Sequence, residues 1–217
     1  MTKIILTNDG SHSLFSEEAD EHYHSKLGAI SESLHVFIKN GINRTTKKEI
    51  KILEIGFGSG LNALLTQIKC EKENRMCNYY TLEKFPVKRE LISKLNYCQK
   101  LEINETIFNK IHDVEWNVEQ IISPNFTLTK LEEDVLDFRT KVKFDIIYFD
   151  AFSPEKQPKV WEEAILKNMY SFLLKDGFLI TYCAKGIIKR RLKKIGFEIE
   201  SLAGPMGKRE ITQAKKK

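Results

Sequence analysis

The segment "LEIGFGSGLN", residues 53–62, decides the fold of this chain, because it joins a strand, a tight turn and a helix. The apolar run over residues 50–55 predicts a buried strand, and "LNALLTQIK" after the glycines has the composition of a helix. Gly56, Gly58 and Gly60 allow backbone angles that other residues resist, and they let the backbone approach a ligand closely. A turn that binds nothing would use the same glycines, so the turn alone does not establish a binding site.

The alternation of strands and helices continues along the chain. Further strands are predicted at "CNYYTLEK", "NFTLTKLEEDV", "FDIIYFD", "DGFLITYCA", "FEIESL" and "KREITQA". Together with the first strand, they predict an α/β fold with a mostly parallel, seven-stranded sheet and helices on both faces. The length fits a single domain over residues 1–217, with an N-terminal extension over 1–45 and a core over 46–214.

Helices are predicted before and between these strands. The apolar residues of segment 26–40 recur at helical spacing, which predicts an amphipathic helix with Ser25 as its N-cap. Further helices are expected over about 86–97 and 159–173, and a short one at "IIKRRLKKI". The lysine-rich tail after Ala214 is expected to be solvated and disordered.

The composition describes a soluble globular protein, with 41% apolar and 30% charged residues. There is no run of 18 apolar residues, so no membrane span is expected, and the N-terminus has no signal-peptide pattern. The four cysteines form no CxxC pair and have no histidine at metal spacing, so they predict free thiols, no metal site and a cytoplasmic location.

Acidic residues at three strand ends predict a ligand site. In a parallel sheet the carboxyl ends of the strands face one crevice, and Glu83, Asp134 and Asp150 each stand at such an end. Glu83 suits both hydroxyls of a ribose, Asp134 suits an exocyclic amine, and Glu54 suits an amino-acid group. S-adenosylmethionine carries all three groups, and it is the expected cofactor. The expected cofactor-binding residues are Glu54, Gly56, Phe57, Gly58, Gly60, Asn62, Glu83, Lys84, Asp134 and Val135.

Other nucleotide-binding turns fit the glycine segment less well. The dinucleotide fingerprint has its third glycine one residue later than Gly60. No lysine followed by serine or threonine completes a phosphate-binding loop of the P-loop type. A nucleoside cofactor that carries an amino acid therefore remains the best match.

The segment "FDIIYFDAFSPEKQPKVW", residues 144–161, ends a buried strand on Asp150. Aspartate followed by serine and proline is also ordinary turn chemistry, so this residue taken alone supports both readings.

Several motifs together resemble a known family. The chain is similar to the methyltransferase half of the bacterial MnmC family, which completes 5-methylaminomethyl-2-thiouridine at the tRNA wobble position, in its stand-alone MnmD-type form. The most specific matches are "DAFSPEKQPKVW" and "GPMGKRE", with "TNDGSHSL", "LEIGFGSGLN" and "LEKFP" in the same order, so the resemblance covers nearly the whole chain. It implies a class-I methyltransferase Rossmann-like fold, and methyl transfer to the primary amine of 5-aminomethyl-2-thiouridine in the anticodon loop.

The resemblance also implies roles for individual residues. Asp150 is the expected catalytic residue, which pairs with the substrate ammonium and takes its proton. The expected substrate-binding residues are Tyr23, His24, Glu32, Phe152, Ser153, Lys185, Lys208 and Arg209. The chain has no room for the FAD-dependent oxidoreductase half of the two-domain relatives, so a separate enzyme is expected to supply the aminomethyl precursor. A monomer is expected.

Other functions stay open from the sequence. The same fold serves methyltransferases and aminopropyltransferases that act on small-molecule amines, and a catalytically silent RNA-binding module would also keep it. The basic stretch "KGIIKRRLKK" within a chain of net charge +5 suits a phosphate backbone and a solvated helix face equally well.

Overall fold

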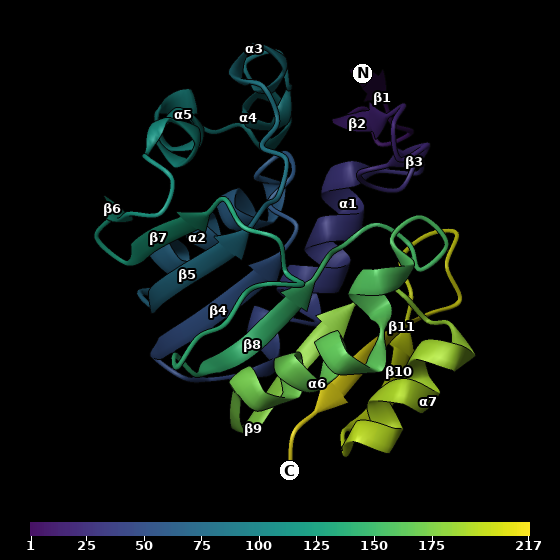
Figure 1. Ribbon diagram of the computed structural model, residues 1–217. Coiled ribbons are helices and arrows are strands. Elements are labelled where there is room, and N and C mark those ends of the chain that lie inside the picture. Colours follow the sequence, from purple (N-terminus) through teal and green to yellow (C-terminus); the bar gives the residue numbers. More distant parts are fainter.

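The computed structural model describes residues 1–217 and contains an eight-stranded sheet. Its strand order is β10-β11-β9-β8-β4-β5-β7-β6 (Figure 1). The five central strands, β9, β8, β4, β5 and β7, are parallel to one another, and the outer strands are antiparallel to their neighbours. The strand bounds are β4 Glu49–Ile55, β5 Met76–Leu82, β6 Glu119–Ser123, β7 Phe126–Leu131, β8 Phe144–Phe149, β9 Leu173–Thr181, β10 Glu198–Ala203 and β11 Glu210–Lys215.

Helices cover both faces of this sheet. In Figure 1, α6 (Glu163–Phe172) and α7 (Gly186–Ile195) lie in front of it, and α2 (Leu61–Glu73) lies behind it. Side chains alternate between the faces along each strand, so Ile52 joins the core under α2 and Leu53 joins the core under α6. The expected class-I α/β architecture is confirmed, but the count of seven strands was wrong.

The additional strand is β6 at the sheet edge, which forms a hairpin with β7. Its register shifts between Ile121 and Ser123, and Ile121 is 70% exposed. A short, irregular strand at the edge buries few apolar side chains, so its sequence carries little of the alternation that identifies strands.

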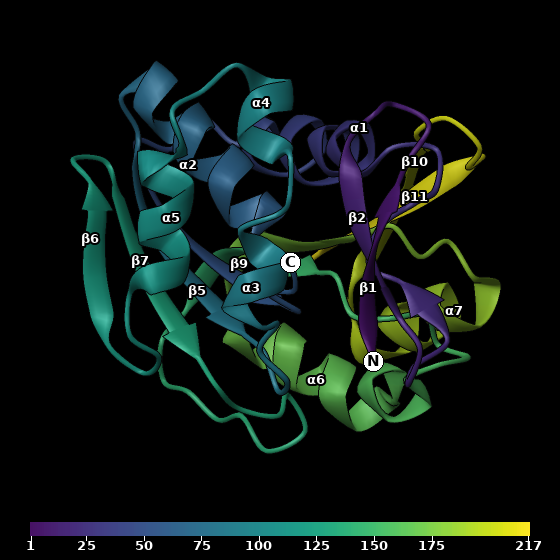
Figure 2. The ribbon, with the colours of Figure 1, turned by 90° about the horizontal axis from the view of Figure 1, so that it is seen from above.

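The N-terminal extension contains a second, three-stranded antiparallel sheet that the sequence analysis did not predict. Its strands are β1 Thr2–Leu6, β2 His12–Ser16 and β3 Glu21–His22. In Figure 2, seen from above, this sheet (purple) lies over part of the main sheet, and none of its strands pairs with a strand of the main sheet. The helix expected over 26–40 begins at α1 (Ala29–Ser33) and continues as a π-helix, η1, over Leu34–Lys39.

Ser25 does not cap this helix. Its Oγ accepts a hydrogen bond from the backbone of Leu27 at 3.2 Å, and Gly28 occupies the N-cap without a side-chain bond. The backbone amide of Ala29 instead donates to Ser11 Oγ at 3.2 Å, so a residue of the turn between β1 and β2 satisfies the helix start.

Two other helices are shorter than expected. Segment 86–97 contains α3 (Arg89–Ile92) and ends where α4 (Tyr97–Leu101) begins, and α5 (Glu105–Asp113) follows. Segment 159–173 divides into a 3-10 turn, η3 (Pro158–Trp161), and α6, because the backbone of Glu162 is extended. A second 3-10 turn, η2, spans Ile42–Arg44.

The expectation that the lysine-rich tail is disordered was wrong, although Lys215 and Lys217 are exposed to solvent. β11 continues to Lys215, and Lys216 Nζ donates to the carbonyls of Tyr170 and Leu173 at 3.0 and 2.8 Å. The four cysteines are free and buried. None of the helices has the length and apolar composition needed to cross a lipid bilayer.

Candidate active site

Backbone hydrogen bonds bring four strand ends together at one edge of the main sheet. The amide of Asp150 donates to the carbonyl of Ile55 at 3.0 Å, and the amide of Gly56 donates to that of Leu82 at 3.0 Å. The amide of Glu83 continues the row with a 3.0 Å bond to Leu131. β8, β4, β5 and β7 thus end in register, and the residues that follow them lie side by side.

The glycine turn is shaped for close approach. Gly56 has φ +93°, and a Cβ there would lie 2.8 Å from the carbonyl oxygen of Asp150. Gly60 has φ +71° and forms the left-handed N-cap of α2. Only glycine combines these backbone angles with this spacing, so the turn needs both residues.

Glu83 closes over the turn. Its Oε2 accepts the amide of Gly58 at 3.0 Å, and its Oε1 accepts the amide of Phe85 at 2.9 Å. Burial raises the pKa of this carboxyl, and the backbone hydrogen bonds oppose the shift. Each oxygen keeps a lone pair for a further donor, which suits the two hydroxyls of a ribose.

Asp134 follows β7 and is more open. Its Oδ1 accepts the amide of Leu136 at 3.0 Å, and its Oδ2 pairs with Lys84 Nζ at 2.7 Å. Partial burial raises the pKa of Asp134, but the hydrogen bonds from Leu136 and Lys84 outweigh it, so the net shift is downward and the group is ionised. Val135 beside it is buried in the core under α6.

Asp150 holds its carboxylate against the start of α2. Its Oδ2 accepts a hydrogen bond from Asn62 Nδ2 at 2.8 Å. Burial raises the pKa of Asp150 to about 7, and the nearby charge of Glu32 adds to the increase, whereas Asn62 and Lys208 oppose it. A carboxyl with this pKa takes up and releases protons near neutral pH, which is the requirement for a general base.

Glu54 lies under the turn rather than in the crevice. It has no exposed surface, and its Oε2 accepts a 2.7 Å hydrogen bond from Thr81 Oγ1. Burial raises the pKa of Glu54 to about 8; the bond from Thr81 opposes this increase, and the charge of Asp150 adds to it. A direct bond from Glu54 to a ligand would require the turn to open.

The N-terminal extension reaches the loop after Asp150 through three contacts, one of which is the ion pair of Lys156 Nζ with Asp20 Oδ2 at 2.8 Å. Ser153 Oγ donates to Glu21 Oε2 at 2.6 Å. The ring of Tyr23 meets the edge of Phe152 with ring centres 5.1 Å apart, and burial raises the pKa of Tyr23 to about 12. The structure therefore brings Tyr23 and Phe152 into contact and ties Ser153 to the extension, while their role in substrate binding stays a prediction.

Three side chains hold the backbone of the loop after Asp150 by hydrogen bonds. The amide of Phe152 donates to Gln157 Oε1 at 3.0 Å, and its carbonyl accepts from Trp161 Nε1 at 2.8 Å. The carbonyl of Ala151 accepts from Tyr182 Oη at 2.9 Å. Tyr182 was missed in the sequence analysis, since only the tertiary fold brings the end of β9 to this loop.

Glu32, which is buried, and Lys208, which is partly exposed, form an ion pair beside this loop. Lys208 Nζ lies 2.5 Å from Glu32 Oε1 and 4.3 Å from the ring centre of Tyr182, and Glu32 Oε2 accepts the amide of Ser25. His24 Nδ1 lies 3.3 Å from Ser13 Oγ. Burial lowers the pKa of His24 to about 4, so this ring is neutral.

The other two expected tRNA contacts lie further out. Lys185 is exposed, precedes α7 and forms an ion pair with Glu155. Arg209 is exposed in the turn between β10 and β11, where its carbonyl accepts the amide of Gly204.

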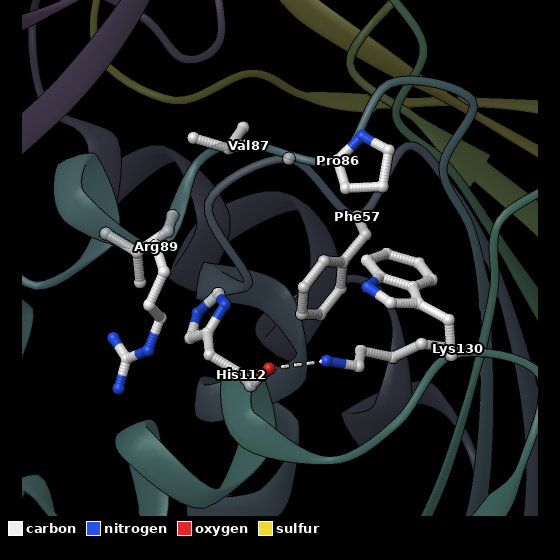
Figure 3. A pocket seen from close by; sticks show the side chains of 9 residues that line it. Phe57, Pro86, Val87, Arg89, His112 and Lys130 are labelled. Atoms are coloured by element: carbon white, nitrogen blue, oxygen red, sulfur yellow. Dashed lines mark hydrogen bonds between the residues drawn. The ribbon is translucent and has the colours of Figure 1, made fainter.

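Phe57 and Gly58 of the glycine turn line a cavity of about 140 Å³ together with Pro86, His112 and Lys130 (Figure 3). The ring of Phe57 packs 5.3 Å from that of His112 and 5.9 Å from that of Trp116. Lys130 is 1% exposed there and donates to the carbonyl of His112 at 2.7 Å. The glycine turn predicted Phe57 and Gly58 as ligand-binding residues, but the rest of the lining comes from three other segments that no sequence pattern connects to the turn.

Comparison with known proteins identifies the family. Residues 92–217 match the family described as S-adenosyl-L-methionine-dependent methyltransferase. The chain belongs to this family. S-adenosyl-L-methionine is accordingly its cofactor, as the strand-end acids predicted. No three histidine, cysteine or acidic side chains are grouped so that they could hold a metal ion.

The resemblance to MnmC proteins is confirmed. The chain is 30% identical over 210 residues to the tRNA 5-methylaminomethyl-2-thiouridine biosynthesis bifunctional protein MnmC of Leptospira interrogans, covering 90% of this chain and 32% of that protein. It is 28% identical over 225 residues to the same-named protein of Cupriavidus metallidurans, covering 97% and 33%. The chain thus spans about a third of the length of these relatives.

A solved structure shares the whole fold. The crystal structure of MnmC2 from Aquifex aeolicus superposes with a TM-score of 0.81 at 26% identity, covering 100% of this chain and 70% of that one.

Proposed function

We propose that the chain transfers a methyl group from S-adenosyl-L-methionine to the primary amine of 5-aminomethyl-2-thiouridine at the tRNA wobble position. The names of the MnmC relatives support this substrate. The observation that carries the proposal is the carboxylate of Asp150, whose pKa is about 7, at the end of β8 beside the glycine turn.

The residues at the strand ends fit the cofactor. The glycine turn lets the backbone approach its amino-acid end closely, Glu83 offers carboxylate oxygens to the ribose, and Asp134 with Val135 borders the base. Lys84 holds Asp134 in place through the 2.7 Å ion pair. When bound, the cofactor supplies an electrophilic methyl group on a sulfonium.

Asp150 deprotonates the substrate amine. A primary alkylammonium has no lone pair, so Asp150 pairs with it and takes one proton. The neutral nitrogen can then accept the methyl group that the bound cofactor would supply, and the electron pair of the carbon–sulfur bond would stay on the cofactor's sulfur. The methylated nitrogen leaves as an ammonium, and Asp150 returns its proton to solvent. Holding nitrogen, carbon and sulfur in line supplies much of the rate gain.

The substrate base would lie between the extension and the loop after Asp150. Phe152 and Tyr23 offer aromatic surfaces on which an unstacked uracil can rest. Lys185 and Arg209 are exposed and suit phosphate contacts, which position a nucleic acid without reading its sequence. Lys208 forms an ion pair with Glu32. It therefore lines the substrate pocket rather than contacting the tRNA phosphate backbone.

The test uses purified protein, S-adenosyl-L-methionine and tRNA that carries 5-aminomethyl-2-thiouridine, with nucleosides analysed by mass spectrometry. We expect one added methyl group on that nucleoside. Asp150→Asn should lower the rate at least about 100-fold, while calorimetry shows that the cofactor still binds. Cofactor binding without methylation by the wild-type protein would refute the tRNA substrate and favour a small-molecule amine.

A further inference from the structure

A primary ammonium group, that of Lys208, lies between a carboxylate and an aromatic ring beside the loop after Asp150. Its Nζ is 2.5 Å from Glu32 Oε1 and 4.3 Å from the centre of the Tyr182 ring. A carboxylate next to an aromatic face is an arrangement that recognises ammonium ligands, through a charged hydrogen bond and a cation–π contact. Glu32 and the Tyr182 ring together are named the ammonium site below.

Both groups of the ammonium site are held by bonds that do not involve Lys208. Glu32 Oε2 accepts the backbone amide of Ser25 at 2.6 Å, and the hydroxyl of Tyr182 donates to the carbonyl of Ala151 at 2.9 Å. The Glu32 side chain is only 9% exposed. Without Lys208 the site would keep its shape and would contain a buried carboxylate with no counter-charge, so it would favour another cation.

Lys208 is free to leave this site, because it belongs to the surface turn between β10 and β11. The amide of Lys208 donates to the carbonyl of Pro205 at 2.9 Å, so the turn holds itself together, and Met206 at its tip is 80% exposed. The side chain of Lys208 makes one hydrogen bond, to Glu32. Rotating that side chain outward therefore breaks its contacts with Glu32 and Tyr182 and leaves the turn intact.

The ammonium site lies next to the catalytic carboxylate. The hydroxyl of Tyr182 bonds to the carbonyl of Ala151, which directly follows Asp150. Beyond the effect of burial, the charge of Glu32 raises the pKa of Asp150 and that of Lys208 lowers it, so both charges are within reach of Asp150. The proposed substrate carries the same head group as lysine, a primary ammonium on a methylene carbon.

We propose that Glu32 and the Tyr182 ring bind the ammonium of the substrate, and that Lys208 fills this site until the substrate displaces it. Glu32 and Tyr182 thus select a primary ammonium, and Asp150 takes its proton. The identity of the substrate rests on the proposed function. The affinity of the site for an ammonium does not, because it is a property of the protein without tRNA.

Three variants distinguish an exchangeable ammonium from a permanent ion pair. Lys208→Met removes the competing ammonium, so the KM for tRNA should fall at least about three-fold. Glu32→Gln removes the carboxylate that binds the substrate, so KM should rise about ten-fold or more while kcat changes less than about three-fold. The double variant Glu32→Gln with Lys208→Met loses both charges and keeps both shapes, and its KM should be as high as that of Glu32→Gln alone.

The ion pair of Lys47 with Asp145 provides the matched control. Lys47 Nζ lies 2.6 Å from Asp145 Oδ1, and the other oxygen of this buried carboxylate accepts the amide of Lys51 at 2.8 Å. The pair therefore has the same construction, but it lies at the opposite end of β8 from Asp150. Lys47→Met with Asp145→Asn should leave KM within about two-fold of wild type.

A second measurement needs neither tRNA nor turnover. Lys208→Ala removes the propylammonium part of the side chain, so free n-propylammonium has the shape and charge that fill the vacated space. We expect n-propylammonium chloride to raise the melting temperature of Lys208→Ala above its value in sodium chloride of equal concentration. Wild type and the double variant Glu32→Gln with Lys208→Ala should melt at the same temperature in both salts.

A KM of the Glu32→Gln, Lys208→Met variant equal to that of wild type would overturn the exchange, because the two residues would then form only a structural ion pair. A higher KM for Lys208→Met would also overturn it, since Lys208 would then assist substrate binding. So would an unchanged melting temperature of Lys208→Ala in n-propylammonium. If wild-type protein methylates no tRNA, the proposed function fails, and the melting temperatures still decide whether the site binds an ammonium.

Discussion

Replacing Glu54 by glutamine should stabilise the protein, with a gain that depends on pH. Glu54 has no exposed surface, and its pKa rises from 4.5 to about 8 on folding, mainly because of burial. The folded state therefore keeps a proton that the unfolded state has lost at any pH between these values. Stability falls as the pH rises through this window, because unfolding releases the proton.

The size of the effect follows from the two pKa values. Between pH 4.5 and 8 the free energy of unfolding falls by about 1.4 kcal/mol per pH unit. Relative to its value at pH 4.5, the loss is about 3 kcal/mol at pH 7 and about 5 kcal/mol above pH 8. Glutamine has the shape of the protonated glutamate and keeps the bond from Thr81. Glu54→Gln should therefore equal wild type below pH 4.5 and exceed it by about 3 kcal/mol at pH 7.

Urea unfolding followed by circular dichroism from pH 5 to 8.5 measures this difference. Glu71→Gln is the matched control: hydrogen bonds from Ser123 and Asn125 lower the pKa of Glu71 despite its partial burial, so its replacement should cost about 1–2 kcal/mol. A Glu54→Gln protein that is no more stable than wild type at pH 7, or a difference that stays constant with pH, would refute a protonated Glu54.

Other substitutions test the scaffold of the site. Gly56→Ala should abolish cofactor binding in calorimetry, because its Cβ would lie 2.8 Å from a backbone oxygen at φ +93°, whereas Gly186→Ala meets only a flexible side chain and should bind normally. Trp161→Phe removes the 2.8 Å bond to the carbonyl of Phe152, so the methylation rate should fall several-fold while cofactor affinity stays within about two-fold. Lys216→Ala removes two bonds to backbone carbonyls and should lower the free energy of unfolding by about 1–2 kcal/mol in urea; an unchanged midpoint would mean that the tail is solvated.

Local patterns in the sequence determined most of the main sheet. The apolar runs that end at Ile55, Leu82 and Phe149 are long, buried and bounded by glycine or acidic residues, so strand periodicity identified them. The positions of Glu83, Asp134 and Asp150 followed from a single rule, that parallel strands end at one edge, and the row of backbone hydrogen bonds agrees with it. The edge strand β6 and the N-terminal sheet lacked such runs, because short exposed strands bury little.

Only the tertiary structure decided how the acidic residues differ from one another. Glu54 and Asp134 are both acids at strand ends in the sequence, yet one is fully buried with a raised pKa and the other is paired with Lys84 and ionised. Neither the pairing of Lys208 with Glu32 nor the approach of Tyr182 to the Asp150 loop has a local signal, since these partners are far apart in the chain. Charge and pKa depend on burial and on neighbours in space, and these are set only when the chain is folded.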